Sequence, residues 1–218
     1  MSPSRIAHAI LVTLSALLAA GCATAPKKDY SEFRAADPHS VLIVPVINNT
    51  VSVEAPALFL TTLPIPVAER GYYVFPVNMV KRVLEDEGLG DPGLVHSSDP
   101  SRLCALFGAD AVLYVTIEAW TAQYMVINTQ VTVEFGYVMK DGKTGNTIWT
   151  DRQMIIRDSS SGARDPVTPF IAAIIMKASP NYAGLARSAN NHAFWWKGMG
   201  LPPGPYHVLY GKDPAYGN

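Results

Sequence analysis

Cysteine and charge are both scarce in this chain of 218 residues. It has two cysteines, and charged residues make up 16% of it, with a net charge of −1. A basic face of the kind that binds nucleic acid is therefore not expected. The histidines have no close metal-ligand spacing, and neither a Gly-x-Ser-x-Gly elbow nor a cysteine–histidine arrangement occurs, so we expect no metal site, no cofactor and no enzymatic activity. The histidines are His8, His39, His96, His192 and His207, of which the second and third are interpreted as surface loop residues.

The N-terminus also lacks an apolar run of the roughly 20 residues that a bilayer span needs. Its apolar run covers residues 9–20, follows Arg5 and His8, and no acidic residue precedes Asp29. A charged start, a short apolar core and small residues at its end are typical of an export signal. We therefore predict a signal peptide over residues 1–21.

A cysteine follows this run directly. The segment Ala19-Ala20-Gly21-Cys22 resembles the lipobox of bacterial lipoproteins, with Ala19 where leucine is usual. The resemblance implies that Cys22 receives a diacylglyceryl group and becomes the first residue after cleavage, so that two or three acyl chains anchor the protein. The alternative is an ordinary cleaved signal with a bystander cysteine. Ala23 stands where an aspartate holds lipoproteins at the inner membrane, which favours the outer membrane, and residues 22–37 are interpreted as the lipidated cysteine and a tether.

The rest of the chain, residues 38–218, is predicted to form one α/β domain with C-terminal helices and a tail. The apolar run Val41–Val46 is typical of a strand that is buried on both faces. Residues 129–139 alternate between apolar and polar, a turn follows at 141–146, and residues 147–157 return. This pattern predicts an antiparallel hairpin.

One helix carries clear signals at both of its ends. Asp99-Pro100 is typical of a helix start, and Gly108 of a helix end. Cys104 lies in the apolar stretch between them, so we expect a buried thiol there and no disulfide with Cys22.

Prolines complicate the segment before the first predicted hairpin strand. Pro64 and Pro66 are poorly accommodated inside a helix, so we predict one helix near 56–63 and a separate short turn near 66–70. Asn78 is expected to cap the helix that follows it.

Isolated carboxylates are the only support for an enzyme. Asp110, Glu118 and Glu134 lie on or beside the predicted strands, and a pair of carboxylates across a cleft is able to catalyse hydrolysis. We interpret the first as a cap or turn residue and the other two as parts of a solvated sheet face. Glu69-Arg70 is interpreted as an exposed pair at a helix end.

Five segments, taken in order, resemble the bacterial lipoprotein family filed as domain of unknown function 799. The resemblance implies a layered α/β sandwich with a mixed sheet and an antiparallel hairpin, similar to the N-terminal domain of TolB. Members are typically encoded beside a CsgG-like secretion-pore lipoprotein and another small lipoprotein. It therefore implies a non-catalytic accessory or assembly role with these as partners. The segments are Pro66–Pro76, Phe107–Tyr114, Asp141–Gly145, Pro180–Tyr182 and Gly200–Tyr206.

The C-terminal half offers candidate interface residues. Phe170 and Ile174 lie in a predicted helix that is apolar almost all round, which fits either the core or a subunit interface. Trp195 and Trp196 point about 100° apart on a helix, so either a partner or the C-terminal tail covers one of them. A homodimer or an interface with an accessory protein is the interpretation. The alternative function is a ligand-binding module for a small envelope glycan or lipid, held beside the hairpin by aromatic residues (Tyr124, Tyr137 and Trp149).

Overall fold

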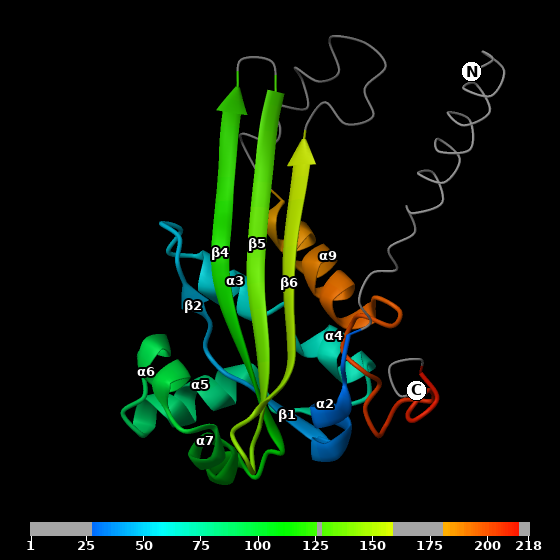
Figure 1. The fold of residues 1–218 in the computed structure, drawn as a ribbon. Coiled ribbons are helices and arrows are strands. Elements are labelled where there is room, and N and C mark those ends of the chain that lie inside the picture. Colours follow the sequence, from blue (N-terminus) through cyan, green and yellow to red (C-terminus); the bar gives the residue numbers. More distant parts are fainter. Residues whose placement is uncertain (1–27, 126–127, 159–180, 214–218) are drawn as a thin grey trace, which may run out of the picture.

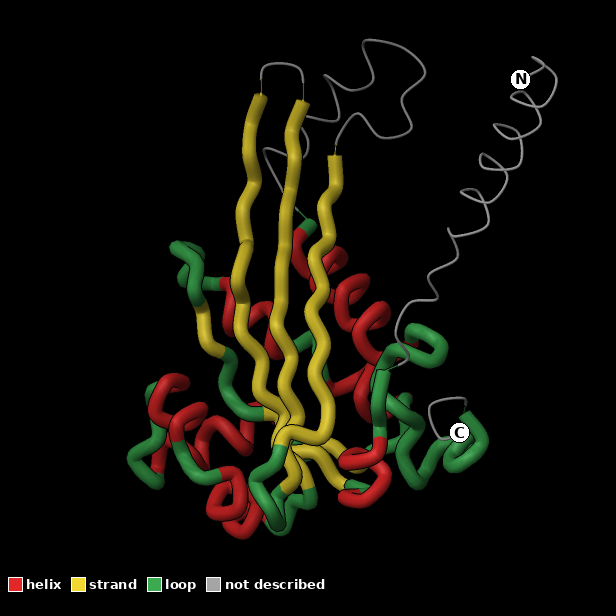
Figure 2. The backbone as a smooth tube through the Cα atoms, viewed as in Figure 1, coloured by secondary structure: helices red, strands yellow, loops and turns green. Residues whose placement is uncertain are grey.

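The structure, a computed structural model, describes residues 28–125, 128–158 and 181–213. It is a layered arrangement of helices on a mixed sheet, so the predicted α/β class is confirmed (Figures 1 and 2). The helices are α2 (Ser31–Ala36), α3 (Ala55–Leu60), α4 (Pro64–Glu69), α5 (Val77–Asp86), α6 (Pro92–Ser97), α7 (Pro100–Phe107) and α9 (Tyr182–Trp195). The strands are β1 (Ser40–Ile43), β2 (Ile47–Asn48), β3 (Tyr73–Val74), β4 (Ala111–Met125), β5 (Asn128–Asp141) and β6 (Thr147–Asp158).

The sheet joins a short parallel part to a long antiparallel part. Its strand order is β3-β1-β4-β5-β6, and β2 pairs with β4 beyond the end of β1. Strand β1 is parallel to both of its neighbours, with Val41 opposite Val74 and Ala111. Strands β4, β5 and β6 are antiparallel, with Tyr137 opposite Val115 and Asp151. The predicted hairpin is therefore confirmed as β5–β6, and β4 extends it to three strands.

Apolar residues on the two faces of the sheet form two separate cores. Along β1, Val41 and Ile43 enter the core shared with α2, α3, α4 and α9, whereas Leu42 packs against α5, α6 and α7. This alternation confirms the prediction of a strand buried on both faces. The predicted inward positions of β5 are also confirmed, since all five are buried: Val131, Val133, Phe135, Tyr137 and Met139.

Helix ends show which local signals were sufficient. The Asp99 side chain accepts a hydrogen bond from the Ser101 N–H, Pro100 begins α7, and Gly108 ends it with φ 70°, as predicted. The predicted cap at Asn78 is wrong, because α5 begins at Val77 and places Asn78 inside the helix.

The proline-based prediction for the preceding segment is partly wrong. A helix does form close to the expected place as α3, but α4 begins at Pro64 and also includes Pro66. Both prolines lie in the first turn of α4, where backbone N–H groups have no partner within the helix, so a missing N–H costs no hydrogen bond.

The predicted tether is too long at its C-terminal end. Tyr30 and Phe33 are buried in the core, and Ser31–Ala36 is helix α2. The hydroxyl of Tyr30 donates a hydrogen bond of 2.7 Å to the Gly200 carbonyl oxygen, which fixes this segment to the other end of the chain. The residues from Tyr30 to Ala36 therefore belong to the folded domain.

Candidate functional site

Of the residues predicted for lipidation or an interface, the structure describes only the two tryptophans. Cys22, Phe170 and Ile174 lie outside the described residues, so lipidation and the predicted apolar helix stay predictions. Trp195 is the last residue of α9 and Trp196 caps that helix.

Neither tryptophan enters the core. Trp195 is 39% exposed and Trp196 is 58% exposed, because α9 buries the opposite face of the helix, including Phe194. The Trp196 ring lies 6.3 Å from the His192 ring, and the Trp195 ring lies 5.9 Å from the His207 ring of the tail. The tail therefore touches one tryptophan without covering the pair.

A buried arginine packs against the ring of Trp195. Arg70 is only 4% exposed, and its guanidinium carbon lies 5.2 Å from the centre of the Trp195 ring. Arg70 donates a hydrogen bond of 2.5 Å to the Leu201 carbonyl oxygen and forms a 3.5 Å ion pair with buried Asp213. The prediction of an exposed ion pair with Glu69 is therefore wrong. Sequence reasoning missed this role because the partners of Arg70 lie more than 130 residues away.

The C-terminal tail is fixed against the α4–β3 corner. The backbone N–H of Gly204 donates to the Arg70 carbonyl oxygen at 2.8 Å, and the Tyr72 hydroxyl donates to the Pro202 carbonyl oxygen at 2.6 Å. Gly71 makes this approach feasible, since a side chain there would meet the backbone of His207 at 2.6 Å. The tail thus holds the surface around Trp195 in one arrangement.

The first described residue lies beside the same surface. The ammonium group of Lys28 donates to the carbonyl oxygens of Thr150 and Met199, and it lies 3.7 Å from the Asp151 carboxylate. Burial lowers the pKa of Lys28 and raises that of Asp151, while their attraction opposes both shifts. Met199 follows Trp196 in a tight turn, so the start of the described chain lies beside the C-terminal end of α9 (Figure 1).

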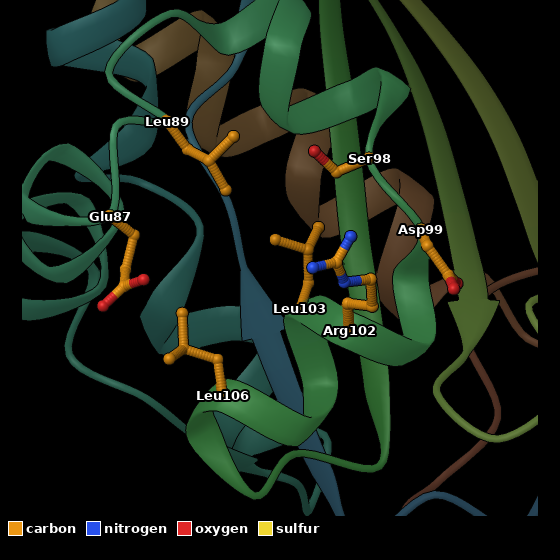
Figure 3. Close-up of a pocket in the computed structure, with 7 residues that line it drawn as sticks. All are labelled: Glu87, Leu89, Ser98, Asp99, Arg102, Leu103 and Leu106. Carbon is orange, nitrogen blue, oxygen red and sulfur yellow. The ribbon is translucent and has the colours of Figure 1, made fainter.

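The surface of the described residues has several open depressions, and two of them are the larger ones. One, of about 440 Å³, is lined by Asn191, His192, Trp195 and Trp196. The other, of about 380 Å³, lies between the end of α5 and helix α7, where leucine side chains surround it and Glu87 and Arg102 are exposed at its rim (Figure 3). Its residues are Glu87, Leu89, Ser98, Asp99, Arg102, Leu103 and Leu106.

The upper parts of β4, β5 and β6 run past the end of α9 (Figure 1). We call residues 119–125, 128–134 and 152–158 the hairpin arm. Strand β6 forms one edge of the arm and residues 119–125 of β4 form the other, and no further described strand pairs with either edge. Met154 and Ile156 point away from α9 and are 54% and 53% exposed. The arm therefore combines an unpaired strand edge with exposed apolar side chains.

The candidate catalytic carboxylates are not brought together in a cleft. Asp110 accepts hydrogen bonds from the backbone N–H groups of His39 and Ser40, at 3.1 and 2.9 Å, and so fixes the start of β1. Glu118 accepts from the Asn49 side chain at 2.9 Å, and Glu134 accepts from Arg152 at 2.7 Å. Each carboxylate therefore has a structural partner.

The aromatic residues behind the ligand-binding alternative face the core. Tyr137 and Trp149 are buried and pack against Phe194, and the Tyr137 hydroxyl donates a 2.8 Å hydrogen bond to Asn190. The side chain of Tyr124 lies outside the described residues. Tyr137 therefore lines no cleft beside the hairpin, whereas Trp149 lines one depression of about 190 Å³ together with Lys28, and the ligand-binding alternative stays a prediction.

The remaining candidate groups are the thiol of Cys104, the imidazole of His96 and possible metal ligands. Cys104 is a buried free thiol, as predicted, and burial, with Asp110 and Asp141 nearby, raises its pKa to about 12. The loop interpretation of His96 is wrong, because it lies on α6 and its Nε2 is 2.9 Å from the Pro45 carbonyl oxygen. Among the described residues, no group of three or more His, Cys, Asp or Glu side chains is placed to hold a metal ion.

The fold defines a mixed α/β domain, and comparison with known proteins gives the family. No helix in the described ranges is long and apolar enough to cross a bilayer. The family described as "Putative lipoprotein GNA1162-like" matches residues 28–192, so the chain belongs to that family. This membership is consistent with a protein held at a membrane of the cell envelope by lipid, and the description of the family names no catalytic activity.

Two relatives from Neisseria meningitidis illustrate the likeness. The chain is 29% identical over 165 residues to the "Putative lipoprotein NMB1124/NMB1162" of serogroup B strain MC58, which covers 76% of this chain and 77% of that protein. The crystal structure of lipoprotein GNA1162 is similar with a TM-score of 0.54 and 26% identity, over 65% of this chain and 97% of that one. The mixed α/β fold is thus shared with a solved lipoprotein.

Proposed function

We propose that this chain is an outer-membrane lipoprotein, anchored through acylated Cys22 and facing the periplasm, that serves as a non-catalytic accessory or assembly factor for a CsgG-like secretion or envelope complex. Membership in a lipoprotein family and the lipobox-like segment ending at Cys22 support the anchor. The resemblance to the domain of unknown function 799 family supports the choice of partners, a CsgG-like pore lipoprotein and a small companion lipoprotein.

The hairpin arm is the observation that carries the accessory role. The edge of β6 has backbone groups that can pair with a strand of another chain, which is a recurrent mode of protein recognition. Met154 and Ile156 add apolar contact area on the neighbouring face. A partner that pairs with β6 therefore gains backbone hydrogen bonds and buries both side chains.

The test is mild crosslinking of tagged full-length protein in native membranes, followed by pull-down and mass spectrometry. The informative variant is Ile156→Asp, and its matched control is Leu94→Asp on α6, because both side chains are 53% exposed. We expect the pore lipoprotein or the companion lipoprotein with the wild type and with the control, and a loss with Ile156→Asp. Recovery of the protein alone would contradict the accessory role and leave a self-assembling module.

A separate variant tests the anchor. In Cys22→Ala no thioether to a diacylglyceryl group is able to form, so we expect the protein to leave the membrane fraction and its mass to lack the acyl chains. A wild-type protein without acyl chains would contradict the anchor, whatever the arm binds.

A further inference from the structure

Exposed apolar side chains concentrate at the C-terminal end of the described chain. Seven large ones lie within sixteen residues, and they include both tryptophans. Contacts link the segments, since Trp195 packs on His207 of the tail and the Met199 N–H donates to the Trp196 carbonyl oxygen. We call the seven residues the aromatic patch: Trp195, Trp196, Met199, Tyr206, Val208, Leu209 and Tyr210.

The charged side chains that are exposed between residues 181 and 213 are all basic. Between residues 181 and 213 the only acidic residue is Asp213, which is buried against Arg70. Lys197 and Lys212 are exposed in the same stretch. Across the tail, the Tyr210 hydroxyl donates to the Asp37 carboxylate, which stands at the margin of the patch. Tryptophan and tyrosine beside lysine is the composition that favours the interface of an anionic bilayer.

The length of the anchor restricts which surface faces the bilayer. Cys22 precedes Lys28 by six residues, and six residues span at most about 20 Å even when fully extended. A domain of this size has a radius of gyration of roughly 16 Å, so its far side lies beyond that reach. Lys28 is hydrogen-bonded to the Met199 carbonyl oxygen at 3.2 Å, within the patch itself. An acylated Cys22 therefore keeps the patch close to the membrane surface.

We propose that the aromatic patch rests on the anionic phospholipid surface that holds the acyl chains, and so fixes the orientation of the anchored domain. This rests on the acylation of Cys22 in the proposed function. The tryptophan rings lie at the level of the lipid headgroups, and Lys197 contacts phosphates. The tail that Arg70 and Asp213 hold in place gives the lipid a preformed surface.

Tryptophan fluorescence in full-length acylated protein tests the contact. The protein is reconstituted in vesicles of phosphatidylethanolamine and phosphatidylglycerol, with and without bromine on the acyl chains. Of the four tryptophans, Trp120 and Trp149 are buried and only the patch pair is exposed. We expect brominated lipid to remove from the wild type no more than the share of the emission that comes from the two exposed rings, since bromine quenches only rings at the bilayer. In the Trp195→Ser, Trp196→Ser double variant we expect almost no quenching.

A charge-reversal pair provides the control. Lys197→Glu should weaken quenching in vesicles with phosphatidylglycerol, whereas Lys81→Glu, on the solvent-exposed face of α5, should leave it unchanged. Equal quenching in the two variants would contradict the contribution of charge.

Failure of the patch and failure of the anchor give different results. Vesicle flotation and the mass of the acyl chains report the anchor, and quenching reports the patch. Protein that is acylated and floats without quenching overturns this inference and leaves the anchor intact. Protein that is not acylated overturns both. If a second copy or another protein covers the patch, quenching is absent, and the complex dissociates in detergent when both tryptophans are replaced. That result also overturns the inference.

Discussion

A buried polar contact between α9 and the sheet allows the sharpest test of the fold. Asn190 is completely buried, accepts a hydrogen bond of 2.8 Å from the Tyr137 hydroxyl, and donates at 2.8 and 3.2 Å to the hydroxyl and carbonyl oxygens of Thr62. In Asn190→Ala three hydrogen bonds are lost and the buried Tyr137 hydroxyl loses its partner. At about 1 kcal/mol for each of the two bonds to Thr62 and 1–3 kcal/mol for the stranded Tyr137 hydroxyl, we expect a loss of about 3–5 kcal/mol.

A double-mutant cycle separates the hydrogen bond from packing. Tyr137→Phe alone should cost about 1–2 kcal/mol, because it leaves the Asn190 oxygen unpaired. In the Asn190→Ala background it should be neutral or stabilising, since it removes a hydroxyl that has already lost its partner, which gives a coupling energy of at least about 1–2 kcal/mol. The measurement is urea unfolding followed by circular dichroism, with the slope unchanged among variants.

Tyr114 supplies the matched control. Its hydroxyl is buried and has no hydrogen-bond partner among the described residues. Tyr114→Phe should therefore be neutral or stabilising, in contrast to Tyr137→Phe. Equal costs for the two substitutions, or a cost for Tyr137→Phe that is the same in both backgrounds, would refute the reasoning.

Three further predictions concern other parts of the fold. Gly142→Ala should lower the free energy of unfolding in urea by about 1–3 kcal/mol, because the added methyl group would lie 2.5 Å from the Cys104 sulfur. Gly136→Ala should lower it little, because the space around Gly136 is free, and equal losses in the two variants would contradict this. Burial raises the pKa of Cys104 from 9.0 to about 12, so the thiol ionises at lower pH in the unfolded chain than in the folded one. The free energy of unfolding should therefore fall as the pH rises from about 9 towards 12. At pH 8 maleimide should label Cys104 only as fast as the protein unfolds, and rapid labelling of the folded protein would contradict this. Arg70→Ala should cost about 3–5 kcal/mol by leaving Asp213 buried without this cation, and trypsin should then cleave the tail faster; an unchanged urea midpoint would contradict it.

Strand positions were predictable because their signals are local. The alternation along β5 has a period of two, and every predicted inward residue from Val131 to Met139 is buried. The continuous apolar run at Val41–Val46 likewise indicated burial on both sides, since a strand between two layers of helices has no polar face. Pairing partners followed less directly, because nothing near β1 in the sequence indicates that it pairs with β4.

Helix starts were predicted unevenly. Asp99-Pro100 predicted the start of α7. The same dipeptide at Asp91-Pro92 begins α6, although no helix was predicted there. The Asp91 side chain accepts a hydrogen bond from the Leu94 N–H at 3.1 Å, so Asp91 caps α6 in the same way as Asp99 caps α7. The prediction at Asn78 failed although asparagine is a common cap residue. Pro76 occupies the N-cap position of α5 and makes no side-chain hydrogen bond there.

The candidate site depends on contacts that no local pattern contains. An arginine is normally exposed, and Arg70 is buried only because Asp213 and the Leu201 carbonyl oxygen meet it from the tail. Tyr30 and Phe33 were assigned to a tether because polar residues surround them, and they enter the core through contacts with Gly200 and Tyr72. The tryptophan pair was predicted as a candidate surface, but its place beside Lys28 required the folded structure.

Helix α9 connects the two proposed surfaces and also keeps them apart. Its C-terminal end has Trp195, and near its N-terminal end the Tyr182 ring stacks on Trp120, at the base of the hairpin arm, with 4.9 Å between ring centres. A helix of 14 residues is about 21 Å long, so a partner on the arm does not compete directly with lipid at the patch. We therefore expect the Trp195→Ser, Trp196→Ser double variant to lose quenching by brominated lipid and still crosslink to the partner. Ile156→Asp should show the reverse, and loss of both properties in either variant would contradict two independent surfaces.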